Sequence, residues 1–117
     1  MKRIVLIEDD DAIRDIFQIV FTANDIELVS FENGDKIVDN DIDAPDLFIL
    51  DKQISGTDGL EVCRFIKNSQ KYKNVPVLML SANPDIIKLA QEAGADGAIP
   101  KPFSLQPMRE TVLSFIK

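Results

Sequence analysis

The residues best suited to chemistry are acids, one hydroxyl and one lysine that follow short apolar runs. The chain opens MKRIVLIEDDD, so an apolar run ends in Glu8, Asp9, Asp10 and Asp11. Four adjacent carboxylates repel one another, most strongly where water is partly excluded. Either these acids are spread around a turn in solvent, or a cation lies among them.

Three more polar residues follow later apolar runs: Asp51 after DLFIL, Ser81 after VPVLML and Lys101 after DGAI and one proline. An oxygen-only site with one or two direct carboxylates and water suits Mg²⁺ better than zinc, which prefers nitrogen and sulfur ligands. A divalent metal beside a lysine, a hydroxyl and a forward carboxylate suits phosphoryl transfer. A carboxylate is a competent nucleophile in that chemistry and forms an aspartyl phosphate.

These side chains can act together only if the fold brings them together. Apolar runs that read as strands alternate with amphipathic runs that read as helices. The predicted strands are 3–8, 26–31, 46–50, 75–80 and 96–99. The predicted helices are 12–23, 34–38, 60–66, one from Asn83 as N-cap to Gly94 as C-cap, and 105–116 with Leu105 facing inward. This alternation predicts an α/β, doubly wound (flavodoxin-like) five-stranded parallel sheet of order 2-1-3-4-5, with helices on both faces.

In such a sheet, ligands bind outside the carboxyl ends of the strands, where the strand order reverses. The first and third strands are neighbours there, so we expect Glu8, Asp9 and Asp51 to meet at one edge, with Ser81 and Lys101 beside them. A divalent metal between them would explain why the acids tolerate one another. Asp10 and Asp11 are instead expected to serve the start of the following helix.

Composition restricts the other function classes. The 117 residues predict one domain, 1–117, and the net charge of −7 disfavours binding to nucleic acid. The chain has no signal peptide and no apolar run near the length of a membrane span, which predicts a cytoplasmic protein. Cys63 is the only cysteine, interpreted as a small buried hydrophobe, and Tyr72 is interpreted as a loop aromatic. The absence of histidine excludes histidine catalysis within this chain.

The runs VLIEDD, DLFILDKQISGTDGLEV, PVLMLSA and GADGAIPKPF together resemble the receiver domain of two-component response regulators, of the single-domain chemotaxis type or the phosphorelay type. The resemblance covers essentially the whole chain. Asp51 precedes Ser81 by 30 residues and Lys101 by 50, which agrees with the family's spacing. Four motifs in order on strand ends are specific, although each is weak alone.

The resemblance implies a role for each site residue. Asp51 would be the phosphoacceptor, Lys101 would contact the acceptor and the phosphoryl group, and Ser81 would hydrogen-bond a phosphoryl oxygen. The Lys101–Pro102 bond would be cis. The implied Mg²⁺ ligands are Asp51, Asp9 directly, Glu8 largely through water, and the main-chain carbonyl of Gln53.

The implied function is a phosphoacceptor switch rather than an enzyme. A partner histidine kinase or histidine phosphotransfer protein would donate the phosphoryl group, and its added charge of about −1.5 to −2 would draw Ser81 and Lys101 inward. The output face would comprise the fourth helix, the fifth strand and the last helix. The output partner would be another protein or an effector domain missing from this chain, since the chain is either a stand-alone receiver or cut from a longer regulator.

Two departures from the family pattern and three rival functions remain. Ala98 stands where many receivers carry the aromatic residue of the switch, with Pro100 directly before the lysine, and Ser55 stands where proline is common.

One rival is a receiver-like docking module that is not phosphorylated. A small Asp-nucleophile phosphatase is disfavoured because DKQIS lacks a second acid two residues after the nucleophile. A flavin-binding domain is disfavoured because no phosphate loop follows the first strand.

Overall fold

The computed structural model describes residues 1–23, 25–54 and 56–116, so Ser55, where the family commonly has proline, lies outside the described residues. One parallel sheet has the order β2-β1-β3-β6-β7, which confirms the predicted topology. Its strands are β1 (Lys2–Ile7), β2 (Ile26–Phe31), β3 (Leu47–Asp51), β6 (Val77–Ser81) and β7 (Gly97–Pro100). The helices are α1 (Asp11–Thr22), α2 (Asp35–Val38), α3 (Gly59–Asn68), α4 (Ile86–Glu92) and α5 (Leu105–Ser114).

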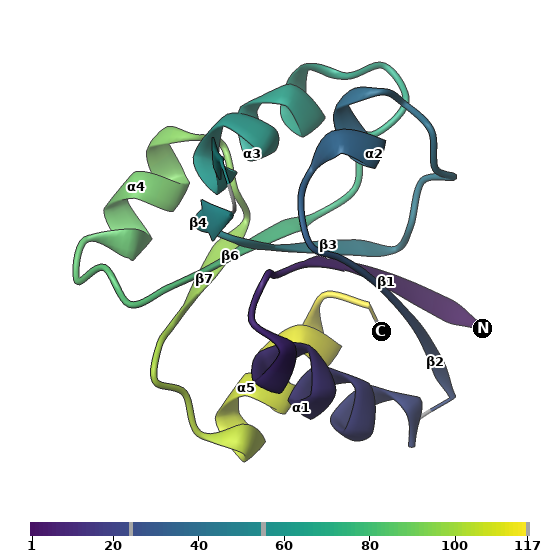
Figure 1. The fold of residues 1–117 in the computed structure, drawn as a ribbon, viewed down its shortest axis with the longest axis vertical. Coiled ribbons are helices and arrows are strands. Elements are labelled where there is room, and N and C mark those ends of the chain that lie inside the picture. The colour runs from purple at the N-terminus through teal and green to yellow at the C-terminus, as the bar shows by residue number, and fades with distance from the viewer. Residues whose placement is uncertain (24, 55, 117) are drawn as a thin grey trace.

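Helices cover both faces of this sheet. Figure 1 shows α2, α3 and α4 on one face, with α1 and α5 on the other. Successive strand residues point to opposite faces, so Val5 and Ile7 join the core cluster under α3, while Ile4 and Leu6 join the cluster under α1 and α5. All four are buried, which explains why the strand is apolar throughout rather than alternating.

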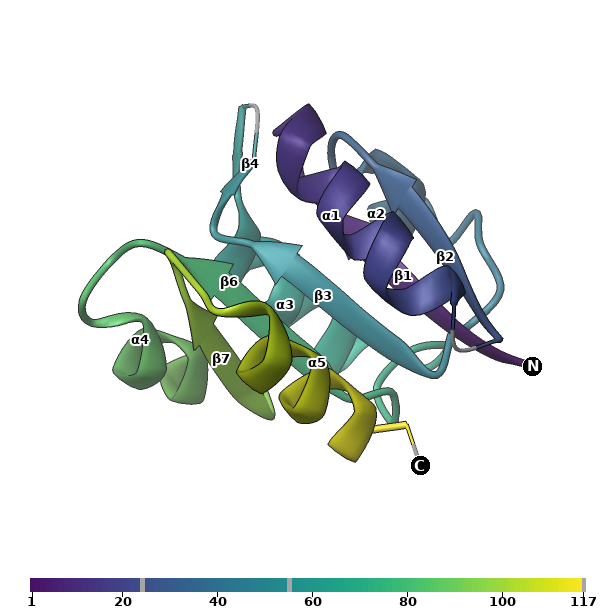
Figure 2. The ribbon, with the colours of Figure 1, turned by 90° about the horizontal axis from the view of Figure 1, so that it is seen from below.

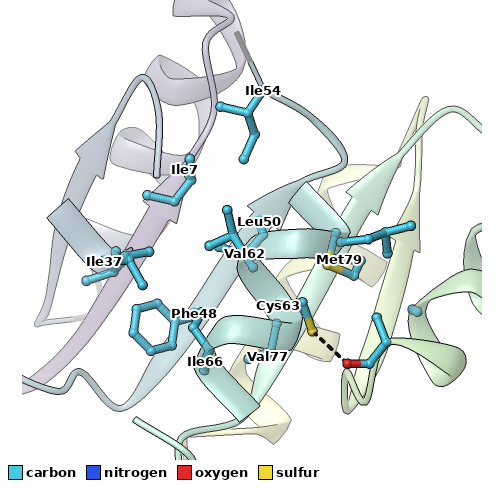
Figure 3. Packing of buried hydrophobic residues seen from close by; sticks show 14 of the residues in the cluster. Ile7, Ile37, Phe48, Leu50, Ile54, Val62, Cys63, Ile66, Val77 and Met79 are labelled. Carbon is cyan, nitrogen blue, oxygen red and sulfur yellow. Dashed lines mark hydrogen bonds between the residues drawn. The ribbon is translucent and has the colours of Figure 1, made fainter. Parts of the chain in front are cut away.

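The cluster under α3 contains the single cysteine. Figure 3 shows side chains of α3 facing those of β3: Val62, Cys63 and Ile66 against Phe48 and Leu50. The Cys63 thiol donates to the carbonyl oxygen of Ala93 at 3.6 Å. Burial raises the pKa of this thiol to about 11. The interpretation of Cys63 as a buried small hydrophobe is confirmed.

Tyr72 lies in a turn between α3 and β6, which confirms its interpretation as a loop aromatic, but its side chain is fully buried. Its hydroxyl donates to the carbonyl oxygen of Ile42 at 2.8 Å. Its ring meets that of Phe48 edge-on, with centroids 5.4 Å apart. Tyr72 therefore joins the loop before β3 to the segment after α3, and its polar sequence neighbours hide this role.

Three predicted details at helix ends can be compared with the structure. The fourth helix, α4, begins at Ile86 with Asp85 as its N-cap residue, and not directly after Asn83. A turn precedes it, in which the Asn83 side chain accepts from the amide of Asp85 at 2.9 Å and the Asn83 carbonyl oxygen accepts from the amide of Ile86 at 3.1 Å. Gly94 follows the end of α4 with a φ of 87°, which confirms the predicted stop. Leu105 was expected to face inward but is 53% exposed. As the first residue of α5, its side chain leans back beyond the helix start.

The segment after β3 contains an element that the sequence patterns did not predict. Gln53–Ile54 (β4) and Thr57–Asp58 (β5) pair antiparallel as a short hairpin. Figure 2 shows β4 projecting beyond the end of β3. Among the described residues, no helix is long and apolar enough to cross a membrane.

Candidate functional site

Strand register brings the predicted acids together. Ile7 of β1 lies opposite Leu50 of β3, so Glu8 just beyond β1 and Asp51 at the end of β3 are neighbours. Carboxylate oxygens of Glu8, Asp9 and Asp51 all lie within 4.8 Å of one another. Glu8 and Asp51 are buried and Asp9 is exposed, so the cluster opens to solvent on one side.

Lys101 connects the two buried acids. Its Nζ lies 2.9 Å from Oε1 of Glu8 and 3.2 Å from Oδ1 of Asp51. Its amide donates to the carbonyl oxygen of Ser81 at 2.8 Å, which ties the end of β7 to the end of β6. The bond from Lys101 to Pro102 is cis, as the resemblance implied. The lysine thus reaches the acids from the opposite end of the sequence.

Burial and mutual contacts shift the pKa values of Glu8 and Lys101. Burial raises the pKa of Glu8 to about 7, with the nearby Asp51 also raising it and Lys101 partly lowering it. Burial alone would lower the pKa of Lys101, but its contacts with Glu8 and Asp51 outweigh burial and raise it. Lys101 therefore stays charged while Glu8 loses its proton near neutral pH. One ammonium cannot neutralise three carboxylates, so an additional cation would be stabilised there.

Ser81 lies at a strand end, as the strand pattern predicts, and Gln53 follows the end of β3. Ser81 ends β6 and is buried, and its Oγ accepts from the amide of Asn83 at 3.0 Å. Gln53 begins β4, two residues after Asp51, and its side chain is exposed. The metal-ligand role of its main-chain carbonyl stays a prediction. Asp10 caps α1 by accepting from the amides of Ala12 and Ile13, which confirms its structural role.

Gly59 supports the acceptor and has no role in the sequence interpretation. It begins α3, and a Cβ built there would lie 2.0 Å from the carbonyl oxygen of Asp51. Its amide donates to the carbonyl oxygen of Lys52 at 2.7 Å. Only glycine permits this approach of the α3 start to the end of β3. The DG pair that opens a helix is the sequence signal that could have identified it.

The donor set fits a hard divalent cation. Every side chain in the acid cluster offers carboxylate oxygen. The sequence has no histidine, and its single cysteine is buried against Ala93. Mg²⁺ prefers oxygen ligands and retains several waters, which the exposed side of the cluster at Asp9 can admit. The residues present therefore fit Mg²⁺ and do not fit a structural zinc site.

Position 98, where the resemblance implies an aromatic residue, holds a small side chain. Ala98 lies on β7 opposite Met79 of β6 and packs, half-buried, against the cluster under α3. Pro100 ends β7 and is exposed. A methyl group cannot rotate into or out of a cavity as an aromatic ring can. Rotation of the side chain at position 98 therefore cannot provide a switch.

Comparison with known proteins identifies the family. The family model for the response regulator receiver domain matches residues 4–113. The transcriptional regulatory protein ResD of Bacillus subtilis is 36% identical over 114 residues, covering 95% of this chain and 45% of ResD. The chain spans about half the length of the curated relatives that it matches.

Solved structures share the fold. The chemotaxis response regulator CheY4 of Vibrio cholerae superimposes with a TM-score of 0.88 at 21% identity, covering 98% of each chain. The receiver domain of the sensor histidine kinase PA1611 of Pseudomonas aeruginosa gives a TM-score of 0.86 at 20% identity, covering 98% of this chain and 97% of that one. That receiver holds a magnesium ion in its active-site cleft. By its fold and by the family model that spans it, this chain belongs to the response regulator receiver domain family.

Proposed function

We propose that residues 1–117 form one receiver domain that switches by phosphorylation of Asp51 in two-component or phosphorelay signalling. The observation that carries the proposal is the buried Asp51 carboxylate, which Lys101 contacts at 3.2 Å beside the carboxylates of Glu8 and Asp9. This geometry provides a nucleophile, a fixed cation and an oxygen donor set at one sheet edge. Asp51, Lys101 and Ser81 are the proposed reactive groups.

The proposed reaction moves one phosphoryl group from a partner's phosphohistidine to Asp51. An Asp51 oxygen forms the new P–O bond, while the P–N bond breaks and its electron pair stays on the imidazole nitrogen, which takes up a proton. Lys101 neutralises charge on the acceptor and the phosphoryl oxygens. Bound Mg²⁺ would supply the remaining positive charge to those oxygens, held by Glu8, Asp9, Asp51 and the carbonyl of Gln53. The magnesium ion in the active-site cleft of the PA1611 receiver supports a magnesium site in a domain of this fold.

Ser81 is the proposed link between the phosphoryl group and the surface. Its Oγ accepts from the amide of Asn83, the residue that leads toward α4. Turning the hydroxyl to donate to a phosphoryl oxygen would alter that contact. The added charge would thereby bias a pre-existing equilibrium of the segment after β6. With Ala98 on β7, the change would reach α4 through backbone movement.

The proposed partners follow from this chemistry. The donor is a histidine kinase or a histidine phosphotransfer protein, because this chain has no histidine of its own. The output partner is another protein or an effector segment, and the transcriptional regulators among the relatives support the second case. We place the reaction in the cytoplasm and propose that the chain regulates partners rather than turning over external substrates.

A labelling experiment tests the proposal. The protein is incubated with Mg²⁺ and acetyl phosphate, and intact-mass spectrometry counts phosphoryl adducts. One acid-stable, base-labile adduct is expected in the wild type and none in Asp51→Asn. Asp41→Asn, which changes an exposed acid paired with Lys36, should be labelled like the wild type. Absence of the adduct, where a reference receiver is labelled, would favour the unphosphorylated docking module.

A further inference from the structure

We propose that Arg14 is a positioning residue that fixes the Glu8–Asp9 peptide in the orientation needed to bind a divalent cation. The inference rests on the proposed function, since it concerns the same acid cluster. Arg14 lies on the first turns of α1, outside the reacting groups. Its role is therefore to orient metal ligands and not to touch the phosphoryl group.

The guanidinium of Arg14 joins three segments of the chain. Its Nη1 donates to the carbonyl oxygen of Glu8 at 2.7 Å. Its Nη2 pairs with the carboxylate of Asp11 in the first turn of α1 and lies 3.7 Å from that of Glu32, just beyond β2. The Arg14 side chain is only 17% exposed, while those of Asp11 and Glu32 are mostly exposed.

The contact with Glu8 is the informative one of the three. Ion pairs with exposed acids contribute little, about 0–1 kcal/mol each. The bond to the Glu8 carbonyl is short, partly buried and charge-assisted, which makes it the strongest and the most directional. The two exposed acids contact the other terminal nitrogen, Nη2, and so leave Nη1 to the Glu8 carbonyl.

This carbonyl belongs to the peptide bond that joins two proposed metal ligands. A peptide unit is planar and contains the Cα atoms of both residues that it connects. A hydrogen bond to the Glu8 oxygen therefore constrains the Cα atoms of both Glu8 and Asp9. The amide of Glu8 is bound in turn to the carbonyl oxygen of Phe31 at 3.0 Å. The peptide units on both sides of Glu8 are thus held, one by β2 and one by Arg14.

Charge and geometry predict opposite effects when Arg14 is removed. Loss of a positive charge near a cation site would by itself strengthen binding of the cation. Loss of the bond to the Glu8 carbonyl would loosen the ligand pair and weaken binding. Residues that orient metal ligands typically change metal affinity by about 10- to 100-fold when mutated. A weaker affinity of the variant for Mg²⁺ therefore indicates that Arg14 positions the ligands, because loss of its charge alone would strengthen Mg²⁺ binding.

Isothermal titration of the full chain with MgCl₂ tests the inference with matched variants. Arg14→Met should weaken Mg²⁺ binding by about tenfold, and Arg14→Lys should restore part of it because an ammonium can still reach the carbonyl. Arg64→Met is the control, since Arg64 makes the same i,i+3 pair with Glu61 on the surface of α3. It removes the same charge from a helix surface and should leave Mg²⁺ affinity unchanged.

The outcomes separate this inference from the proposed function. If the wild type does not bind Mg²⁺, or if Asp9→Asn does not reduce binding, the proposed metal site itself fails. If the wild type binds and Arg14→Met binds equally or more tightly, the positioning role is overturned. Thermal unfolding without Mg²⁺ and amide NMR spectra verify that each variant is folded. If Arg14→Met is unfolded, the Arg14→Lys titration decides, and an affinity equal to that of the wild type would overturn the role.

Discussion

Nζ of Lys101 lies 2.9 Å from Oε1 of Glu8, a contact that joins residues 93 positions apart. The same nitrogen contacts Asp51, so one ammonium bridges the proposed acceptor and a proposed metal ligand. Two strand ends and the loop after β7 are thereby held together around one charge. In the described part of the chain, the ion pairs of Glu8 and Asp51 both involve Lys101. The two buried acids therefore share one cation.

Replacing this lysine should slow phosphorylation. Lys101→Met removes the fixed cation that faces the acceptor and the incoming phosphoryl oxygens. Loss of one such preorganised group typically costs about 10²- to 10³-fold in rate, and we expect the rate of labelling by acetyl phosphate to fall by about 100-fold at saturating Mg²⁺. Lys36→Met, which breaks an exposed pair with Asp41, should leave the rate unchanged. A Lys101→Met rate within threefold of the wild type would contradict the role.

The stability of the metal-free protein should depend on pH through Glu8. The pKa of Glu8 is about 7 in the folded protein, whereas its ordinary value of 4.5 applies to the unfolded chain. Between pH 4.5 and 7 the folded chain therefore binds more protons than the unfolded chain. Stability in EDTA should therefore fall as the pH rises from about 4.5 to 7, and should change no further through this group above that range. Burial of the charged carboxylate is the main cause.

Urea unfolding of the wild type and of Glu8→Gln measures this dependence. The glutamine cannot ionise, so the difference in stability between the two proteins should shift in favour of Glu8→Gln as the pH rises from 5 to 8. Added Mg²⁺ should stabilise the wild type at pH 8 more than Glu8→Gln, because it binds the ionised acid. A difference that does not vary with pH would contradict the raised pKa.

The sequence predicted what depends on local periodicity. Five apolar strand segments alternating with helices predicted the sheet order, which the structure confirms. The four that end near Glu8, Asp51, Ser81 and Lys101 predicted where the polar residues meet. Residues whose role depends on a distant contact were missed. Tyr72 bonds a carbonyl 30 residues away, and neither of its polar neighbours indicates this. Gly59 and Arg14 both act on main-chain oxygens, which carry no residue-specific pattern.

Gly59→Ala should destabilise the protein and disturb the acceptor. The added Cβ would lie 2.0 Å from the carbonyl oxygen of Asp51, a backbone atom that cannot move aside as a side chain can. Overpacking of this kind costs about 1–3 kcal/mol, and we expect the upper part of that range. Gly34→Ala is the control, since its nearest atom is a methyl carbon of Val62 at 2.9 Å. Chemical denaturation should rank Gly59→Ala as clearly the less stable, and equal stability would contradict the close approach.

Tyr72→Phe should destabilise the fold without affecting the site. The substitution keeps the ring against Phe48 but removes the hydroxyl that satisfies the carbonyl oxygen of Ile42. An unsatisfied buried acceptor costs about 1–3 kcal/mol, and we expect about 1 kcal/mol because the carbonyl is only partly buried. Denaturation measures the loss, and titration should give an unchanged Mg²⁺ affinity. A weaker affinity would mean that Tyr72 influences the site through β3.

Phosphorylation should change the environment of the Asn83 amide. That amide donates to Oγ of Ser81 at 3.0 Å, and the hydroxyl must turn toward the phosphoryl group to donate to it. The hydroxyl can still accept while it donates, but its lone pairs are redirected, so the bond from Asn83 should lengthen. Amide NMR spectra recorded with and without acetyl phosphate should show a large shift at Asn83 and changes that extend into α4.

Ser81→Ala separates the chemistry from the signal. The variant retains Asp51, Lys101 and the acid cluster, so acetyl phosphate should still label it. Because the alanine offers neither a donor nor an acceptor, the Asn83 amide should already be displaced before labelling and should respond little afterwards. The control is Ser114→Ala, which should respond as the wild type does. The Ser114 hydroxyl donates to the carbonyl oxygen of Thr111 at 2.6 Å on α5. A full shift of α4 resonances in labelled Ser81→Ala would overturn the role of Ser81 as the link between the phosphoryl group and α4.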